Sequence, residues 1–119
     1  MKTKSIIIIS ALIALMGFIH IGATFSPLIG GKLTCLDGGT YNAMIYMSLM
    51  CGLLLVTLGG YVFWVVRKCS EITRLKPTMH VAAVLLLIDG ISAVAFMPHN
   101  PFAWTIGLLC AVEFLLTVK

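Results

Sequence analysis

Residues 44–66 read MIYMSLMCGLLLVTLGGYVFWVV, a run without a single charged side chain. A helix needs about 20 predominantly apolar residues to cross the hydrocarbon core of a bilayer, so this run is long enough to span one. Similar apolar stretches lie on both sides of it. Together they predict spans at about 6–23, 41–66, 78–97 and 102–118, which is the pattern of an all-α integral membrane protein with four transmembrane helices.

The overall composition leads to the same class. Of the 119 residues, 61% are hydrophobic and only 10% are charged, and the mean hydropathy is +1.11. These values exceed those of ordinary water-soluble domains. The length leaves room for one transmembrane domain over residues 1–119. The net charge of +4 does not indicate a nucleic-acid partner, because the Lys and Arg residues lie beside apolar spans and are not interleaved with aromatic residues.

The first apolar stretch has one feature of a signal peptide, a basic start followed by Ile6–Ile9. However, the stretch is long, His20 interrupts its end, and no clear Ala-x-Ala cleavage site follows. An uncleaved helix is the favoured interpretation.

Prolines mark the predicted ends of the later spans. Pro77 is placed as a first-turn proline of the third span, and Pro98 follows its end. Only the residues from Pro98 to Pro101 separate the third and fourth spans, which predicts a tight antiparallel hairpin.

The distribution of basic residues predicts the orientation. Cytoplasmic ends of spans retain Lys and Arg. In a four-span model, Lys32 falls on one side and all other basic residues fall on the opposite side: Lys2, Lys4, Arg67, Lys68, Arg74, Lys76 and Lys119. We therefore expect an antiparallel bundle with both termini cytoplasmic, in a bacterial inner (plasma) membrane.

Ionisable residues inside the spans supply the candidate functional site. A lone charge in hydrocarbon costs at least about 2.5–3.5 kcal/mol, so it needs a partner or becomes neutral. Asp89 lies about 16 Å from Thr78 along the third helix, and His20 lies about 21 Å from Ile6 along the first. These depths are similar in an antiparallel bundle, so we expect an Asp89–His20 pair able to hold a proton.

Further polar residues extend this candidate intramembrane site. Asn42, Tyr46 and Asn100 are expected to line an outward-opening pocket with the pair, and a purely structural hydrogen-bond network is the alternative. Glu113 and His80 are secondary candidates that pair with each other or with Arg67. Snorkelling of Glu113 and His80 to the interface is the simpler explanation.

No pattern of catalytic, cofactor-binding or metal-binding residues is visible, so none is expected. The four cysteines form no Cys-x-x-Cys motif, and only Cys35 is predicted on the outer side. Gly52 and Gly59 share a helix face, which is consistent with either a homodimer seam or internal packing.

The length and four-span plan resemble the small multidrug transporters and the DoxX-like membrane proteins. The former place a central acidic residue in their first helix, where this chain has His20, while its central acid is Asp89 in the third span. No residue role is therefore transferred from either family.

Three classes of function follow from these observations. The leading one is a small noncatalytic bundle that binds membrane lipids, a second copy of itself or a membrane-protein partner, as an accessory or immunity-type protein. The second is an oligomeric small-solute transporter, proton-coupled through Asp89. The third is a small membrane enzyme using His20 and Asp89.

Overall fold

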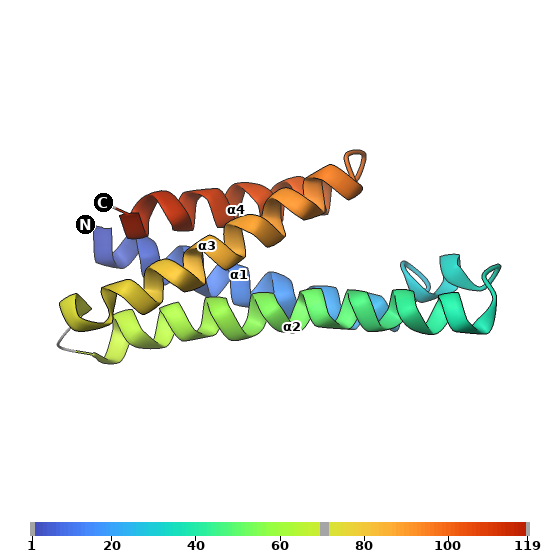
Figure 1. Cartoon of the computed structure of the whole chain (residues 1–119), viewed down its shortest axis with the longest axis horizontal. Helices are drawn as coiled ribbons and strands as arrows, with labels where there is room; N and C mark the ends of the chain where they lie inside the picture. The colour runs from blue at the N-terminus through green and yellow to red at the C-terminus, as the bar shows by residue number, and fades with distance from the viewer. Residues whose placement is uncertain (1, 70–71, 119) are drawn as a thin grey trace.

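The structure is a computed structural model that describes residues 2–69 and 72–118. Its four α-helices are α1 (Lys2–Thr24), α2 (Gly38–Lys68), α3 (Ile72–Phe96) and α4 (Pro101–Val118), and a short 3-10 helix, η1 (Gly30–Leu33), lies between the first two (Figure 1). All four α-helices are long and apolar enough to cross a membrane. The predicted all-helical class and the four membrane-spanning lengths are confirmed.

Each helix contacts two others, so the four form a ring. The α1–α2 and α3–α4 contacts are the most extensive, and smaller contacts join α1 to α4 and α2 to α3. Figure 1 shows both chain ends at the same end of the bundle as the last turn of α2 and the first turn of α3. We call this the terminal end of the bundle, and the opposite end, with residues 25–37 and 97–100, the loop end.

The buried residues follow a seven-residue repeat on every helix. On α1 they are spaced alternately by four and three: Ile6, Ser10, Ile13, Gly17, His20 and Thr24. The buried residues of α4 follow the same rule: Ala103, Ile106, Cys110, Glu113 and Thr117. This spacing places one narrow stripe of each helix toward its neighbours, as in left-handed helix bundles. The outward faces are also apolar, so small and polar residues mark the interior.

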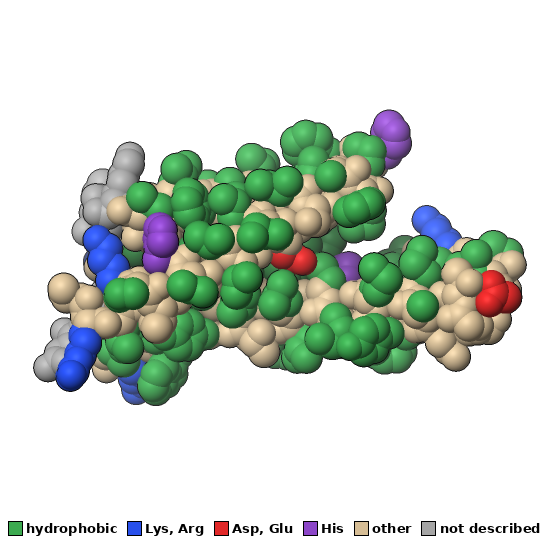
Figure 2. Space-filling view, in the orientation of Figure 1, with side chains coloured by type: hydrophobic (Ala, Val, Ile, Leu, Met, Phe, Trp, Pro, Cys, Tyr) green, Lys and Arg blue, Asp and Glu red, His purple; other side chains and the backbone are tan. Residues whose placement is uncertain are grey.

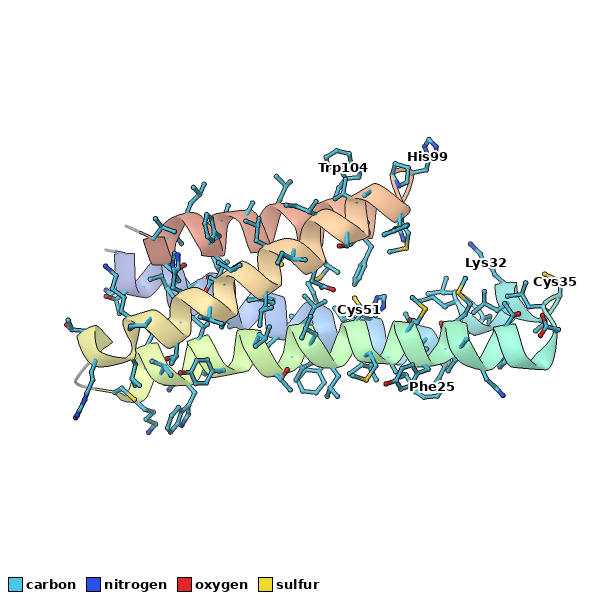
Figure 3. The ribbon with its side chains drawn as sticks, in the orientation of Figure 1. Phe25, Lys32, Cys35, Cys51, His99 and Trp104 are labelled. Carbon is cyan, nitrogen blue, oxygen red and sulfur yellow. The ribbon has the colours of Figure 1, made fainter. Side chains whose placement is uncertain are left out.

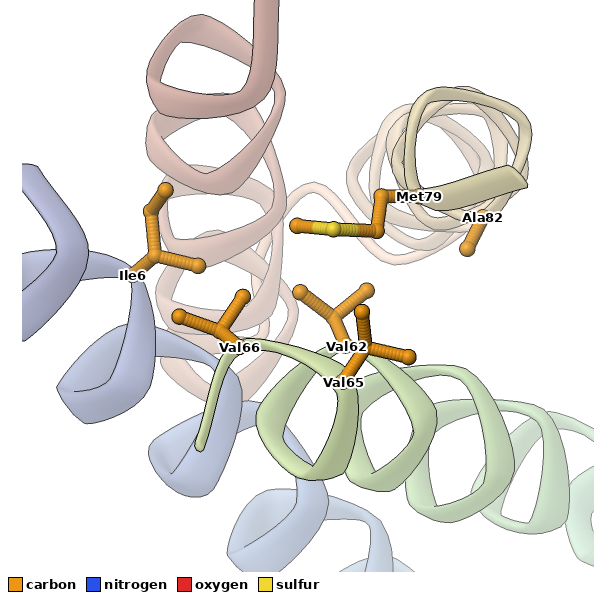
Figure 4. Packing of buried hydrophobic residues seen from close by; sticks show 6 residues of the cluster. All are labelled: Ile6, Val62, Val65, Val66, Met79 and Ala82. Atoms are coloured by element: carbon orange, nitrogen blue, oxygen red, sulfur yellow. The ribbon is translucent and has the colours of Figure 1, made fainter. Parts of the chain in front are cut away.

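Two apolar clusters fill the bundle. The first lies toward the terminal end and joins α1, α2 and α3 through Ile6, Val62, Val65, Val66, Met79 and Ala82 (Figure 4). The second takes residues from all four helices: Ile13, Leu55, Leu86, Ile106 and Cys110. The helices are therefore packed together in the middle and at the terminal end.

Glycines allow α1 and α2 to approach closely. A Cβ added to Gly52 would lie 2.7 Å from Ile21 Cγ1 and 3.1 Å from Gly17 O, and one added to Gly59 would lie 3.0 Å from Ala14 N. Both glycines thus face α1 of the same chain. Of the two interpretations that the sequence leaves open for them, the structure supports internal packing.

Helix α3 begins earlier than predicted, at Ile72. Pro77 therefore lies inside the helix and not in its first turn, so that detail of the prediction is wrong. The position tolerates proline because it removes only one hydrogen bond close to the helix start. Side chains stabilise this turn: Thr78 Oγ1 donates to Leu75 O at 2.8 Å and lies 2.6 Å from Tyr61 Oη on α2.

At the loop end, polar side chains cap the first turns of α2 and α4. Asp37 caps α2, since its Oδ2 accepts from Thr40 N at 3.0 Å and its Oδ1 accepts from Thr40 Oγ1 at 2.6 Å. These hydrogen bonds hold the pKa of the Asp37 carboxyl below its ordinary value. Asn100 Oδ1 accepts from Phe102 N at 3.0 Å at the start of α4. Asn100 thus has a capping role that explains its presence locally.

Candidate functional site

The first polar contact inside the bundle joins α1 to α4. Glu113 is fully buried, and its Oε1 lies 2.7 Å from Ser10 Oγ, which is fully buried as well. Glu113 Oε2 has no hydrogen-bond partner among the described residues. The explanation of Glu113 as a residue snorkelling to the interface is therefore wrong, because the seven-residue repeat of α4 turns it inward.

The second contact joins α2 to α3 through Asp89. The thiol of Cys51 lies 3.5 Å from Asp89 Oδ1 and 3.7 Å from Oδ2. Asp89 is half-buried. Figure 3 shows Cys51 midway along α2, on the side of the helix that faces the α3–α4 pair. A thiol is a weak donor, so this contact leaves most of the hydrogen-bonding capacity of the carboxyl unused.

The third contact joins α1 to α2 near the loop end. Ser48 Oγ lies 3.1 Å from His20 Nε2 and 2.7 Å from Thr24 Oγ1, and Thr24 Oγ1 donates to His20 O at 2.9 Å. Each hydroxyl has one hydrogen, so Ser48 donates to Thr24 and accepts from His20 Nε2–H. The His20 ring also stacks on Phe102 of α4, with 5.7 Å between ring centroids.

The predicted Asp89–His20 pair is not formed. Among the described residues, His20 contacts Ser48 and Phe102, whereas Asp89 contacts Cys51. The prediction compared depths along helices but not directions around them. His20 faces α2 because it belongs to the buried stripe of α1.

The remaining candidates lie apart from these contacts. Asn42 and Tyr46 are exposed on the first half of α2, and Tyr46 has 64% of its surface accessible. His80 is half-buried against Phe114, at 5.6 Å between ring centroids. Arg67 lies over the Phe63 ring. The structure therefore gathers neither the expected outward pocket nor a Glu113–His80–Arg67 group.

The three contacts follow one another along the helices. Ser48 and Cys51 are three residues apart on α2, and Cys110 and Glu113 are three residues apart on α4, a rise of about 4.5 Å in each case. Cys110 packs at Gly90, the neighbour of Asp89: a Cβ added to Gly90 would lie 3.0 Å from Cys110 Cβ. From the terminal end the order is thus Glu113, Asp89 and His20.

The chemistry of these groups is limited by their surroundings. Ser48 and His20 have the spacing of a nucleophile and a base. However, both lie within helices, whose backbone N–H groups are already hydrogen-bonded and cannot stabilise an oxyanion. Within residues 2–69 and 72–118, no three His, Cys, Asp or Glu side chains are grouped closely enough to hold a metal ion.

An apolar groove runs along the outer side of the α3–α4 pair. It has a volume of about 380 Å³ and extends from Trp104 near the loop end toward Leu87 and Ala111 in mid-helix. Its floor forms where Gly90 and Gly107 bring the two helices close together: a Cβ added to Gly90 would lie 3.1 Å from Gly107 Cα. Trp104 Nε1 donates to Pro98 O at 2.9 Å, which fixes the indole at the groove entrance.

No protein-family model, curated protein or solved structure matches the chain.

Sequence reasoning missed Ser10, Thr24, Ser48 and Cys51 as the partners of the ionisable residues. A usable signal was present on α1, because Ser10, Gly17 and Thr24 recur at intervals of seven in a helix that is mostly apolar after Ser5. Small and polar residues at that interval indicate the packed stripe of a membrane helix.

Proposed function

We propose that the chain is a noncatalytic integral membrane bundle that binds a membrane lipid in the groove between α3 and α4. The groove itself is the observation that carries the proposal. It is lined by apolar residues and glycine, and its volume of about 380 Å³ lies in the range of small-molecule sites. Trp104 lies at the groove entrance, and tryptophan side chains are enriched at the headgroup level of a bilayer.

The shape of the groove favours an acyl chain over a partner helix. From Leu87 to Ala95 the α3 wall is about 12 Å long, which matches a large part of one acyl chain. Close helix association needs exposed small residues. Here Gly90 is buried against α4, so this close-contact surface is already used inside the chain.

The proposal is tested by filling the groove. Ala95 is exposed within the groove, and Ala11 is exposed on α1 outside it. We expect Ala95→Phe to weaken lipid retention about tenfold, equivalent to about 1.4 kcal/mol, and Ala11→Phe to leave it unchanged. Native mass spectrometry of the detergent-solubilised protein measures the retained lipid. Equal retention by both variants contradicts the proposal, and a copurifying protein lost only from Ala95→Phe reassigns the groove to a partner helix.

The proposed setting is a bacterial inner membrane, with an antiparallel bundle and both termini cytoplasmic. Lys and Arg side chains gather at the terminal end in Figure 2, whereas Lys32 lies at the loop end in Figure 3. This asymmetry supports a cytoplasmic terminal end. Lys119 lies outside the described residues.

Thiol labelling tests this orientation. Cys35 is exposed at the loop end, and Cys69 is half-buried after the last turn of α2. We expect a membrane-impermeant maleimide to label Cys35 in intact spheroplasts, and Cys69 only after the membrane is opened. The single-cysteine variants serve as controls for each other. Labelling of Cys69 alone in intact spheroplasts inverts the orientation.

A further inference from the structure

Three ionisable residues follow one another along the inside of the bundle, with Glu113 and His20 buried and Asp89 half-buried. Acidic and His residues inside membrane spans are costly, and chains of them carry protons in pumps and transporters. We propose that Glu113, Asp89 and His20 form a proton path from the terminal end to the loop end. The proposal goes beyond lipid binding and does not rest on it.

The geometry at Glu113 accommodates a carboxyl group that holds a proton. Ser10 Oγ lies 2.6 Å from Ile6 O and 2.7 Å from Glu113 Oε1, but it has only one hydrogen to donate. When that hydrogen goes to the Ile6 carbonyl, the second contact is a hydrogen bond only if Glu113 carries a proton and donates it. Glu113 Oε2 is buried and has no partner within residues 2–69 and 72–118, so it is left to accept the next hydrogen bond.

Groups with exchangeable hydrogens lie between Glu113 and the other two residues. Cys110 lies one helical turn from Glu113 and packs against Gly90, the chain neighbour of Asp89, while Cys51 touches Asp89 and lies one turn from Ser48. Ser48 then contacts His20 and Thr24. Ser10, level with Glu113, is ten residues from His20, so the path covers about 15 Å along the bundle axis.

No fixed charge blocks the path within the described residues. Glu113 faces Ser10 from α1, Asp89 faces Cys51 from α2 and Cys110 from α4, and His20 faces Ser48 from α2 and Phe102 from α4. None of these partners is a cation. At the loop end the surface is hollowed between the α1–α2 and α3–α4 pairs, with acidic and His side chains at the floor of the hollow (Figure 2).

The transfer conserves protons at every step. One O–H bond at a carboxyl breaks as a new one forms on a water molecule or on the next carboxyl, and the electron pair of the broken bond stays on the carboxylate oxygen. At His20 the arriving proton binds the free ring nitrogen, and Nε2–H passes its own proton to the Ser48 hydroxyl as Ser48 passes its hydrogen to Thr24. Thr24 in turn releases its own hydrogen to water in the loop-end pocket that it lines. One proton leaves for each that enters. The proposal therefore requires water to enter between the three residues.

The test is proton flux into liposomes that contain the purified full-length protein. A valinomycin-clamped K⁺ gradient drives the flux, and trapped pyranine measures it. We expect flux above protein-free liposomes, a decrease of at least tenfold in Glu113→Gln and in Asp89→Asn, and partial recovery in Glu113→Asp. Asp37→Asn removes an acid outside the path and should conduct as the unmodified protein does, as should Ala11→Phe, which lies outside both the path and the groove.

Each outcome decides the proposal. Unmodified protein that conducts no better than empty liposomes overturns it, as do Gln and Asn variants that both conduct normally. Gel filtration and thermal unfolding verify the fold of each variant. If Glu113→Gln does not fold, Asp89→Asn, which keeps the shape and an acceptor for the Cys51 thiol, decides alone.

Discussion

The two halves of α2 are both apolar, yet they are used differently. Residues Gly38–Cys51 include no buried residue, whereas the following half contains six: Gly52, Leu55, Gly59, Val62, Val65 and Val66. The helix has 31 residues, about 46 Å, which exceeds a hydrocarbon thickness of about 30 Å. Hydropathy therefore determines that α2 enters the membrane but not where α2 meets its neighbours.

Side-chain size explains the difference between the halves. The packed half has Gly52 and Gly59 against α1, where the backbones approach closely. The exposed half has large flexible side chains, Met44, Met47 and Met50, with 45%, 65% and 45% of their surfaces accessible. Lipid is as apolar as leucine, so tight van der Waals contact between small residues decides which half packs.

The largest expected effect comes from crowding the packed half. A Cβ at Gly17 would lie 2.7 Å from Gly52 O and 2.8 Å from Val56 N, both backbone atoms of α2. We expect Gly17→Leu to destabilise the bundle by about 3 kcal/mol, because the two helices must separate. Unfolding in mixed micelles with increasing SDS measures the loss.

Gly22 is the matched control on the same helix. A Cβ there would meet nothing within 4 Å. Gly22→Leu should therefore change stability by less than about 0.5 kcal/mol. Equal losses in both variants would mean that α1 and α2 are not held together at Gly17 and Gly52.

A smaller effect is expected from the polar contact between Ser10 of α1 and Glu113 of α4. Ser10→Ala removes the hydrogen-bond partner of a fully buried Glu113. The unsatisfied carboxyl should cost about 1–2 kcal/mol. Ser92→Ala is the control, since that hydroxyl donates only to Ile88 O of its own helix. An unchanged SDS midpoint for Ser10→Ala would show that Glu113 finds another partner.

The number and class of helices could be predicted from sequence because bilayer thickness fixes the length of an apolar run. The start of α3 could not, because the prediction treated Pro77 as a helix start. The actual helix begins at Ile72 and accommodates this proline through the loss of a single hydrogen bond near its start. Helix ends depend on local hydrogen bonds that hydropathy does not encode.

The candidate site was predicted by residue but not by contact. Asp89, His20 and Glu113 were identified because ionisable groups in a membrane are rare, and depth along a helix follows from its rise. Their partners depend on rotation about the helix axis. In α1 the positions of Ser10, Gly17 and Thr24 indicate which face is buried. The apolar residues do not indicate it, because they occur on every face of the helix.

The smallest expected effect concerns the cap of the exposed half of α2. Thr40 hydrogen bonds lower the pKa of Asp37, so the charged carboxylate is the form that favours the helix start. Because the pKa is lower in the folded state, the carboxylate stabilises the helix start at pH values above its ordinary pKa of about 3.9. This stabilisation is lost as the pH falls through the folded-state pKa. We expect the protection of the Thr40 amide against hydrogen exchange to decrease when the pH falls below about 4.

Asp37→Asn is the control, because it keeps a hydrogen-bond acceptor that does not titrate. In this variant the protection of the Thr40 amide should vary little with pH. The SDS unfolding midpoint should stay constant in both proteins, since Asp37 lies eleven residues, about three helical turns, before Ser48, where α2 hydrogen-bonds to α1. A midpoint that drops with the Thr40 protection would instead couple the exposed half of α2 to the packed half.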